Sequence, residues 1–394
     1  MSKKDKKTKK GFGQYFSLVV YLLTGAAIGF YTSSVMNSPA GESMGVGQRL
    51  LWYASLILCL YVCIFLQIIV HEGGHLIFGL ASGYRFCSFR VASFMLTRAE
   101  GKVKLRRLSL AGTGGQCLMS PPDMRDGRIP YVLYNLGGVL MNTVFSAAAM
   151  LLFLLLPRVP VLSTGLVMFS LMGVAMALTN GIPLRMGAVD NDGYNAMSLG
   201  KDEAALRAFW MQLRVSEQNS HGVRLKDMPP EWFTLPTMEQ MRGNSMIATV
   251  GVFACNRLMD EGRYAEADAL MADMIGGGAA MVGIHKSLLI CDRIWCELMG
   301  ECRVLAVSDM LTKEQQNLMK AMKKFPTVIR TRYVMALLME GDAERAESEA
   351  KQFEVMARSY PYPSDIESER ELMRRARERY AEKMGNTHGG SESL

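Results

Sequence analysis

An uncharged apolar run that ends in a metal-ligand motif constrains this chain most. The run LWYASLILCLYVCIFLQIIV covers residues 51–70 and leads directly into HEGGH at residues 71–75. About 20 apolar residues can cross a hydrocarbon core of roughly 30 Å as a helix. Because positions i and i+4 share one helical face, the imidazoles of His71 and His75 can converge on one zinc ion, with Glu72 beside them as a general base. The sequence therefore predicts a metal site in a membrane-spanning helix, over about residues 51–83.

Three further apolar runs predict membrane spans at about residues 15–36, 131–156 and 161–184. Basic residues gather in the tail at 1–13 and in the loop at 85–128, so the positive-inside rule places both in the cytoplasm. A cleaved signal peptide is the alternative for the first span. We expect an integral protein of a bacterial plasma membrane, with the N-terminus and the C-terminal region cytoplasmic.

The loop at 85–128 contains a predicted β-hairpin. The segments FRVASFML and KVKLRRLSL flank a turn-like AEG at residues 99–101. An edge of this hairpin can bind an extended peptide by strand addition, because a helical substrate must unwind before its backbone can be cut. A ribbon that only packs against the membrane region is the alternative.

A third zinc ligand is expected after the fourth predicted span. Residues 180–183 (NGIP) break that helix, and Asp190 and Asp192 follow, the latter directly before Gly193. Two histidines need a third protein ligand and an open position for water, and either aspartate can supply that ligand. A solvated turn is the alternative reading of DNDG. In the third span, Asn142 is a polar side chain that can hydrogen-bond an oxyanion or a substrate backbone.

The second half of the chain, residues 200–384, has a soluble helical pattern. Two segments pair amphipathic helices across Gly262 and Gly341, which predicts hairpins of the tetratricopeptide type. Residues 385–394 read as a disordered tail. The eight cysteines follow no zinc spacing, and most of them are expected to be reduced, buried thiols. The modest basic surplus is explained by topology, so no nucleic-acid partner is expected.

The ordered set of motifs resembles the site-two protease family of intramembrane zinc metalloproteases. HEGGH is followed by NLGGVLMN at residues 135–142 and by NGIP and NDG between residues 180 and 193. The resemblance covers about residues 51–195. It implies a mainly α fold: a polytopic membrane bundle of about four spans with a small β-hairpin loop, over residues 14–199, followed by the soluble helical repeat-like domain.

The resemblance also implies roles for the named residues. His71 and His75 match the two imidazole ligands, Asp192 matches the carboxylate ligand, Glu72 matches the general base, and Asn142 matches the polar position of the middle span. The expected function is zinc-dependent hydrolysis of a membrane-spanning or membrane-bound peptide or protein, near the cytoplasmic side. The helical domain is expected to select substrates or bind a cytosolic adaptor. A membrane scaffold with a structural metal site is the alternative.

Overall fold

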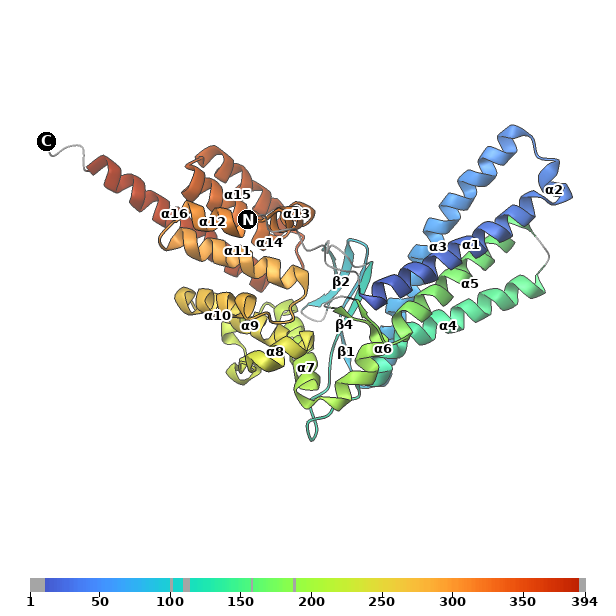
Figure 1. The fold of residues 1–394 in the computed structure, drawn as a ribbon, viewed down its shortest axis with the longest axis horizontal. Helices are drawn as coiled ribbons and strands as arrows, with labels where there is room; N and C mark the ends of the chain where they lie inside the picture. The colour runs from blue at the N-terminus through green and yellow to red at the C-terminus, as the bar shows by residue number, and fades with distance from the viewer. Residues whose placement is uncertain (1–10, 100–101, 109–113, 157–158, 187–188, 390–394) are drawn as a thin grey trace, which may run out of the picture. The chain divides into compact units, whose positions relative to one another are not determined.

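A computed structural model describes residues 11–99, 102–108, 114–156, 159–186 and 189–389 (Figure 1). The chain forms two compact units. The first unit comprises Met1–Phe86 and Gly114–Glu203, and the second comprises Cys87–Thr113 and Ala204–Leu394. The predicted basic tail at residues 1–13 lies mostly outside the described residues.

Four helices of the first unit are long and apolar enough to cross a membrane, as predicted. They are α1 (Phe12–Met36), α3 (Val46–Ala81), α4 (Tyr131–Leu155) and α5 (Pro160–Gly181), with the short α2 (Pro39–Glu42) between the first two. Helix α5 packs against the other three long helices, and α3 and α4 pack against each other (Figure 1). Helix α3 starts before the predicted span, where the side chain of Gln48 accepts a hydrogen bond from the N–H of Gly45 at 3.0 Å. Capping by this polar side chain lets the helix begin in a segment without apolar character.

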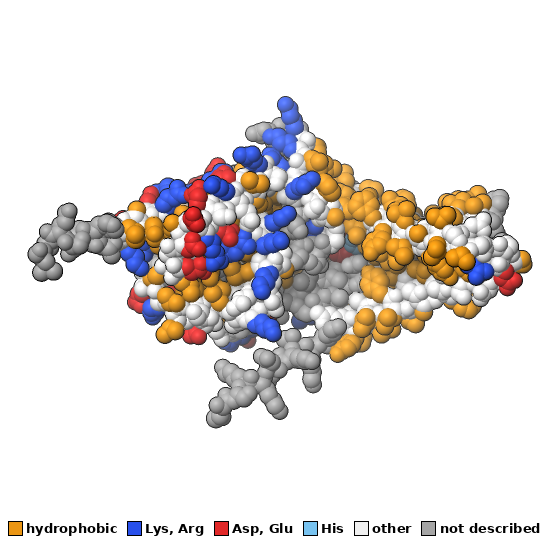
Figure 2. Space-filling view, turned by 90° about the horizontal axis from the view of Figure 1, so that it is seen from above, with side chains coloured by type: hydrophobic (Ala, Val, Ile, Leu, Met, Phe, Trp, Pro, Cys, Tyr) orange, Lys and Arg blue, Asp and Glu red, His pale blue; other side chains and the backbone are white. Residues whose placement is uncertain are grey.

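The outer face of this bundle is apolar, and its interior is partly polar. Large exposed side chains such as Leu51, Ile57 and Leu155 cover the long helices. Figure 2 shows hydrophobic side chains gathered on the surface of the helical bundle. Buried polar side chains include Gln67, Ser170 and others between the helices. This inside-out distribution is typical of helices that face lipid.

Short elements follow the break after α5. They are β5 (Arg185–Met186), β6 (Val189–Asp190), α6 (Asp192–Ser198) and the 3₁₀ turn η1 (Leu199–Lys201). Strands β5 and β6 pair in an antiparallel ladder, with Arg185 opposite Asp190. The predicted break is confirmed, since α5 ends at Gly181 and the chain reverses before α6.

The loop after α3 forms a small sheet with strand order β3-β2-β1-β4. The strands are β1 (Arg85–Val91), β2 (Phe94–Ala99), β3 (Lys102–Arg107) and β4 (Gly115–Ser120). Strands β2 and β3 pair as predicted on either side of residues 100–101, which lie outside the described residues. The predicted first strand at 89–96 was wrong, because the chain turns at Ala92, where φ is 52°, and joins β1 to β2. Strand β4, in a segment predicted only as Gly/Pro punctuation, was missed.

The described residues of the second unit outside strands β1 to β3 are mainly helical. Its elements are α7 (Glu203–Ser220), η2 (Leu225–Asp227), η3 (Pro230–Phe233), α8 (Met238–Gly243), α9 (Ser245–Asp260), α10 (Tyr264–Gly276), α11 (Gly283–Met299), α12 (Val304–Met310), α13 (Lys313–Ala321), α14 (Pro326–Val334), the π-helical turn η4 (Met335–Glu340), α15 (Ala343–Ala357) and α16 (Pro363–Gly389). Turns at Gly262 and Gly341 have φ of 78° and 70°, a conformation that favours glycine, and helices flank both. A tetratricopeptide-type repeat remains a prediction.

Two further contacts define the second unit. The guanidinium of Arg330 is fully buried, and it pairs with the carboxylates of Asp292 and Glu369. The backbone N–H of Arg107 at the end of β3 donates to the carbonyl of Ser359 at 3.0 Å, so this strand edge packs on the helical part of the unit. Helix α16 runs to Gly389, into the predicted disordered tail, of which residues 390–394 lie outside the described residues.

Candidate metal centre

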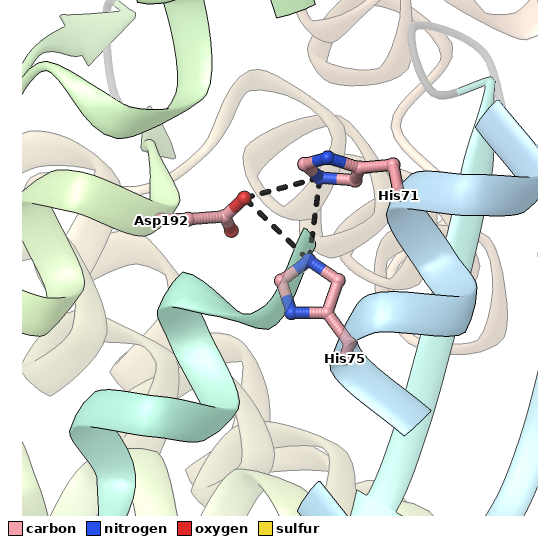
Figure 3. Close-up of side chains that lie close together, drawn as sticks. All are labelled: His71, His75 and Asp192. Atoms are coloured by element: carbon pink, nitrogen blue, oxygen red, sulfur yellow. Dashed lines mark hydrogen bonds and ion pairs between the residues drawn. The ribbon is translucent and has the colours of Figure 1, made fainter. Parts of the chain in front are cut away.

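His71, His75 and Asp192 converge, as the sequence predicted. The two histidines lie one turn apart on the same face of α3, and Asp192 faces them from the start of α6 (Figure 3). The distance between the two Nε2 atoms is 3.3 Å, and Oδ2 of Asp192 lies 3.2 Å from Nε2 of His71 and 3.5 Å from Nε2 of His75. All three belong to the first unit. Residues separated by about 120 positions in the chain thus form one small triangle.

The orientation of both imidazoles leaves the Nε2 atoms for a ligand. Nδ1 of His75 lies 2.7 Å from the backbone carbonyl oxygen of Tyr134, and Nδ1 of His71 lies 2.7 Å from Oδ1 of Asn142. Both partners accept hydrogen bonds, so each neutral imidazole carries its proton on Nδ1 and a lone pair on Nε2. An acceptor behind each ring is the usual support of a metal-binding histidine.

The triangle has the dimensions of a zinc site. Zinc is bound at about 2.0 to 2.2 Å by histidine nitrogen and carboxylate oxygen, so a tetrahedral arrangement separates its ligand atoms by about 3.3 Å. Oδ2 of Asp192 is buried and accepts no hydrogen bond from the described residues. Two imidazole nitrogens and a carboxylate oxygen therefore point at one another, an arrangement that a cation would stabilise. His71, His75 and Asp192 have the residue types and the spacing to hold a divalent cation such as zinc.

The carboxyl group of Asp192 is ionised in this environment. Burial alone would raise its pKa, but His75 and His71, when protonated in the absence of a metal, more than offset the burial and hold the pKa below the ordinary range. The carboxylate is the form that binds a metal ion.

Asn191 holds Asp192 in place. Its buried side chain donates to the carbonyls of Thr179 at 2.8 Å and Ile182 at 2.6 Å, and its Oδ1 accepts from the N–H groups of Leu184 and Tyr194. The amide therefore ties the end of α5 to the first turn of α6 and caps that helix. This role of Asn191 was not predicted, although an asparagine directly before a short helix is a recognisable capping signal.

The two aspartates of DNDG have different surroundings. Asp190 lies in β6, where its Oδ1 is 3.5 Å from Nε of Arg185, whereas Asp192 faces the histidines. Gly193 follows Asp192 because a Cβ there would lie 2.1 Å from the carbonyl oxygen of Gly181. Asp192 thus faces the histidines, and the absence of a side chain at Gly193 lets the start of α6 approach the end of α5 closely.

Glu72 lies between the histidines in sequence, and it is buried beside β4. A Cβ on Gly115 would lie 2.5 Å from Oε1 of Glu72, so the glycine at the start of β4 makes room for this carboxylate. The predicted general base is thus next to a β-strand edge of the first unit. The role of Gly115 was not predicted from the sequence, because Glu72, which it contacts, lies about 40 residues earlier in the chain.

Glycines also set the distance between α3 and α4 at the site. A Cβ on Gly74 would lie 2.2 Å from the carbonyl oxygen of Gly137, and one on Gly138 would lie 2.6 Å from Nδ1 of His71. By contrast, a Cβ on Gly73 would have nothing within 4 Å. The glycines of HEGGH and NLGGVLMN therefore include pairs that allow two helices and one imidazole to pack closely.

Asn142 contacts the site, but through a histidine. Its Oδ1 accepts from Nδ1 of His71, and its Nδ2 donates to both the backbone oxygen and Oε1 of Gln67, at 3.1 and 2.6 Å. Both N–H groups of the amide are engaged, which favours a positioning role over the predicted contact with an oxyanion. Asn135, the other asparagine of this helix, bonds the carbonyl of Tyr131 within its own helix.

The cysteines form no part of this centre. All eight are free thiols. Burial raises the pKa of the Cys255 and Cys291 thiols to about 12, so both thiols are protonated at neutral pH. The prediction that most cysteines are buried thiols is confirmed, since Cys63, Cys87, Cys117, Cys255 and Cys291 are buried.

No protein-family model, curated protein or solved structure matches this chain. The functional argument therefore rests on the sequence motifs and on the geometry of the centre.

Proposed function

We propose that this protein is a zinc-dependent intramembrane endopeptidase that cuts a membrane-spanning or membrane-bound peptide or protein near the cytoplasmic side of a bacterial plasma membrane. The observation that carries the proposal is the triangle of His71, His75 and Asp192 with Glu72 next to it. A site-two protease would use these residue types in this order along the chain. The apolar outer surface of the bundle supports a location in the lipid bilayer.

The proposed chemistry divides between the metal and the chain. Bound zinc would supply Lewis acidity, which activates water and polarises a carbonyl. Glu72 would accept the proton of the attacking water and return it to the leaving amine. Tyr134 and Asn142 would keep the imidazoles oriented through their contacts with Nδ1.

The substrate is proposed to bind as an extended segment. A peptide bond inside a helix is blocked by its own backbone hydrogen bonds, so the substrate must be unwound where it is cut. Strand β4 is the terminal strand in the order β3-β2-β1-β4, and Gly115 at its start lies next to Glu72. Pairing with this strand would place a substrate carbonyl beside the general base. The opposite edge, β3, is engaged at Arg107 by the helical part of its own unit.

The proposal is tested with the purified full chain in lipid vesicles that also contain a pool of membrane-spanning peptides. Wild type should release fragments, detected by mass spectrometry, and a chelator should stop their release. Glu72→Gln should bind as much zinc as wild type and release no fragments, because the amide cannot accept the proton. Full activity of Glu72→Gln would refute the proposed mechanism.

The size of the helical part of the second unit favours a second role, a scaffold that recruits a cytosolic protein partner. Under the main proposal this region selects substrates or binds an adaptor. A chain that binds zinc, cuts no membrane peptide and keeps its cellular effect as Glu72→Gln would favour the scaffold.

A further inference from the structure

The paired strands β2 and β3 have one face that is apolar and exposed. In their antiparallel register, Leu96 lies opposite Leu105, and Arg98 lies opposite Val103. Paired residues point to the same side of a sheet, and side chains alternate along each strand, so Phe94 also belongs to this face. The exposed fractions are 51% for Phe94, 42% for Leu96, 60% for Val103 and 64% for Leu105. These four side chains form what we call the exposed strand face.

The opposite face of the same strands packs inside the second unit. Met95 is fully buried there, and Thr97 is buried two positions further along β2. Arg106 lies opposite Met95, and its Nη1 donates to the carbonyl oxygen of Arg358 at 3.2 Å. The strands are therefore held on their own unit by one face, and this contact fixes which face they expose.

Two arginines lie on the exposed strand face beside the apolar side chains. Arg107 is opposite Phe94, with its guanidinium 5.4 Å from the centre of the ring, and Arg98 is opposite Val103. Both arginines are exposed, and neither forms an ion pair with the described residues. The sequence of residues 87–108 contains six basic residues and one acidic residue, Glu100. This surface thus combines apolar side chains with uncompensated positive charge.

A bilayer that contains acidic phospholipids fits this combination. Exposed apolar side chains can enter the boundary between head groups and acyl chains, and arginine binds phosphate oxygens in a two-pronged geometry. In water, a contiguous apolar surface of this kind favours association instead. Helix α3, which can span a membrane by length and composition, ends at Ala81, and three residues separate it from Arg85 at the start of β1. The chain therefore keeps the sheet within reach of the bilayer, whereas a protein partner would have to be recruited.

We propose that the exposed strand face binds the surface of a bilayer that contains acidic phospholipids, with Arg98 and Arg107 on the lipid phosphates and the four apolar side chains among the upper acyl chains. Acidic lipid would then hold this part of the second unit at the membrane surface. The proposal rests on the proposed membrane location of the chain, and it is independent of the metal centre, to which the exposed strand face contributes no residue.

The test places the photoreactive amino acid benzoylphenylalanine at the position of Leu105 in the full chain. The chain is held in nanodiscs of phosphatidylcholine mixed with phosphatidylglycerol, the acidic lipid. The matched control places the same amino acid at Leu305 of α12, an apolar residue of the same unit that is 82% exposed and lies outside the sheet. After illumination, mass spectrometry separates lipid adducts from links to a second copy and from links within the chain.

The label at Leu105 should form lipid adducts that are enriched in phosphatidylglycerol relative to the mixture, and the label at Leu305 should form none above background. The double variant Arg98→Gln and Arg107→Gln should lower this enrichment severalfold, because each cation near an anionic surface contributes about fivefold in binding. Arg374→Gln, which removes an exposed cation of α16, should leave the enrichment unchanged.

Links from the Leu105 position only to a second copy, or only to another segment of the chain, would overturn the proposal and assign the exposed strand face to a protein contact. Equal labelling of the two lipids, or an enrichment that the double arginine variant keeps, would also overturn it. Glu72→Gln should form the same adducts as the wild-type sequence. A chain that cuts no peptide but forms these adducts would therefore refute the proposed function and leave the lipid contact standing.

Discussion

A methyl group on Gly138 would lie 2.6 Å from the Nδ1 and Cε1 atoms of His71. The imidazole of His71 thus occupies the space that any other residue at position 138 would fill. Glycine here is a requirement of the metal centre, and it explains one of the two glycines of NLGGVLMN.

Gly138→Ala should therefore displace His71 and weaken zinc binding by at least about tenfold, since a misplaced ligand costs no less than a lost outer support. The measurement is chelator competition on the purified chain. Gly73→Ala is the matched control, because a Cβ there has nothing within 4 Å and alanine favours the helix. Equal zinc affinities of the two variants would contradict the packing described for the site.

The two aspartates should respond differently to the same substitution. Asp192→Asn should abolish zinc binding at neutral pH, because a neutral amide replaces the carboxylate that faces the histidines. Asp190→Asn should keep the zinc, because this carboxylate lies beside Arg185 in β6. Zinc content after dialysis, measured by plasma mass spectrometry, separates the two. If Asp190→Asn loses zinc and Asp192→Asn keeps it, Asp190 is the third ligand in place of Asp192.

Arg330 should be the most sensitive charged residue of the second unit. Arg330→Met leaves the carboxylates of Asp292 and Glu369 buried without their cation, which costs about 3 to 5 kcal/mol of unfolding free energy. Arg374→Met, which breaks an exposed pair with Glu378, should leave stability unchanged within error. Urea unfolding followed by the fluorescence of the buried Trp295 reports on this unit. Similar urea midpoints for Arg330→Met and Arg374→Met would contradict the stabilising role of the buried Arg330 ion pairs.

Asp365 should make the stability of the second unit depend on pH. Burial, followed by the negative charge of Glu369, raises the pKa of its carboxyl from 3.8 to about 7, despite a hydrogen bond from Tyr360. The folded chain therefore holds this proton more tightly than the unfolded chain, and stability falls as pH rises from about 4 through 7. Asp365→Asn cannot ionise, so its melting temperature should drop less between pH 5 and pH 8 than that of wild type. A matched exposed change, Asp309→Asn, should preserve the drop, and an equal drop in Asp365→Asn would refute the explanation.

The convergence of the three residues of the candidate centre was predictable from sequence because each carries a local signal. His71 and His75 have helical spacing, and Asp192 follows a helix break and precedes a glycine. The four apolar helices were predictable for the same reason, since length and composition decide them locally. The choice between Asp190 and Asp192 needed the structure, because it depends on which side of a tight turn each carboxylate faces.

The supports of the centre were not predictable, because they depend on contacts between distant segments. Gln67 stands out as the single amide in an apolar run, yet only the positions of Asn142 and Phe169 give it a role. The turn at Ala92 escaped detection because that residue adopts a positive φ without being glycine. Strand β4 was not predicted because a glycine-rich segment has low strand propensity. Its place in the sheet depends on pairing with β1, which lies in a different part of the loop.

The most direct test of the central claim is a quantitative comparison of membrane proteins between cells that produce the wild type and cells that produce Glu72→Gln at the same level. We predict that at least one membrane protein or peptide accumulates intact in the Glu72→Gln cells, and that its fragments, ending within a membrane span, are found only with the wild type. Identical sets of intact proteins and fragments in the two kinds of cell would contradict the claim that this centre hydrolyses peptide bonds in the membrane.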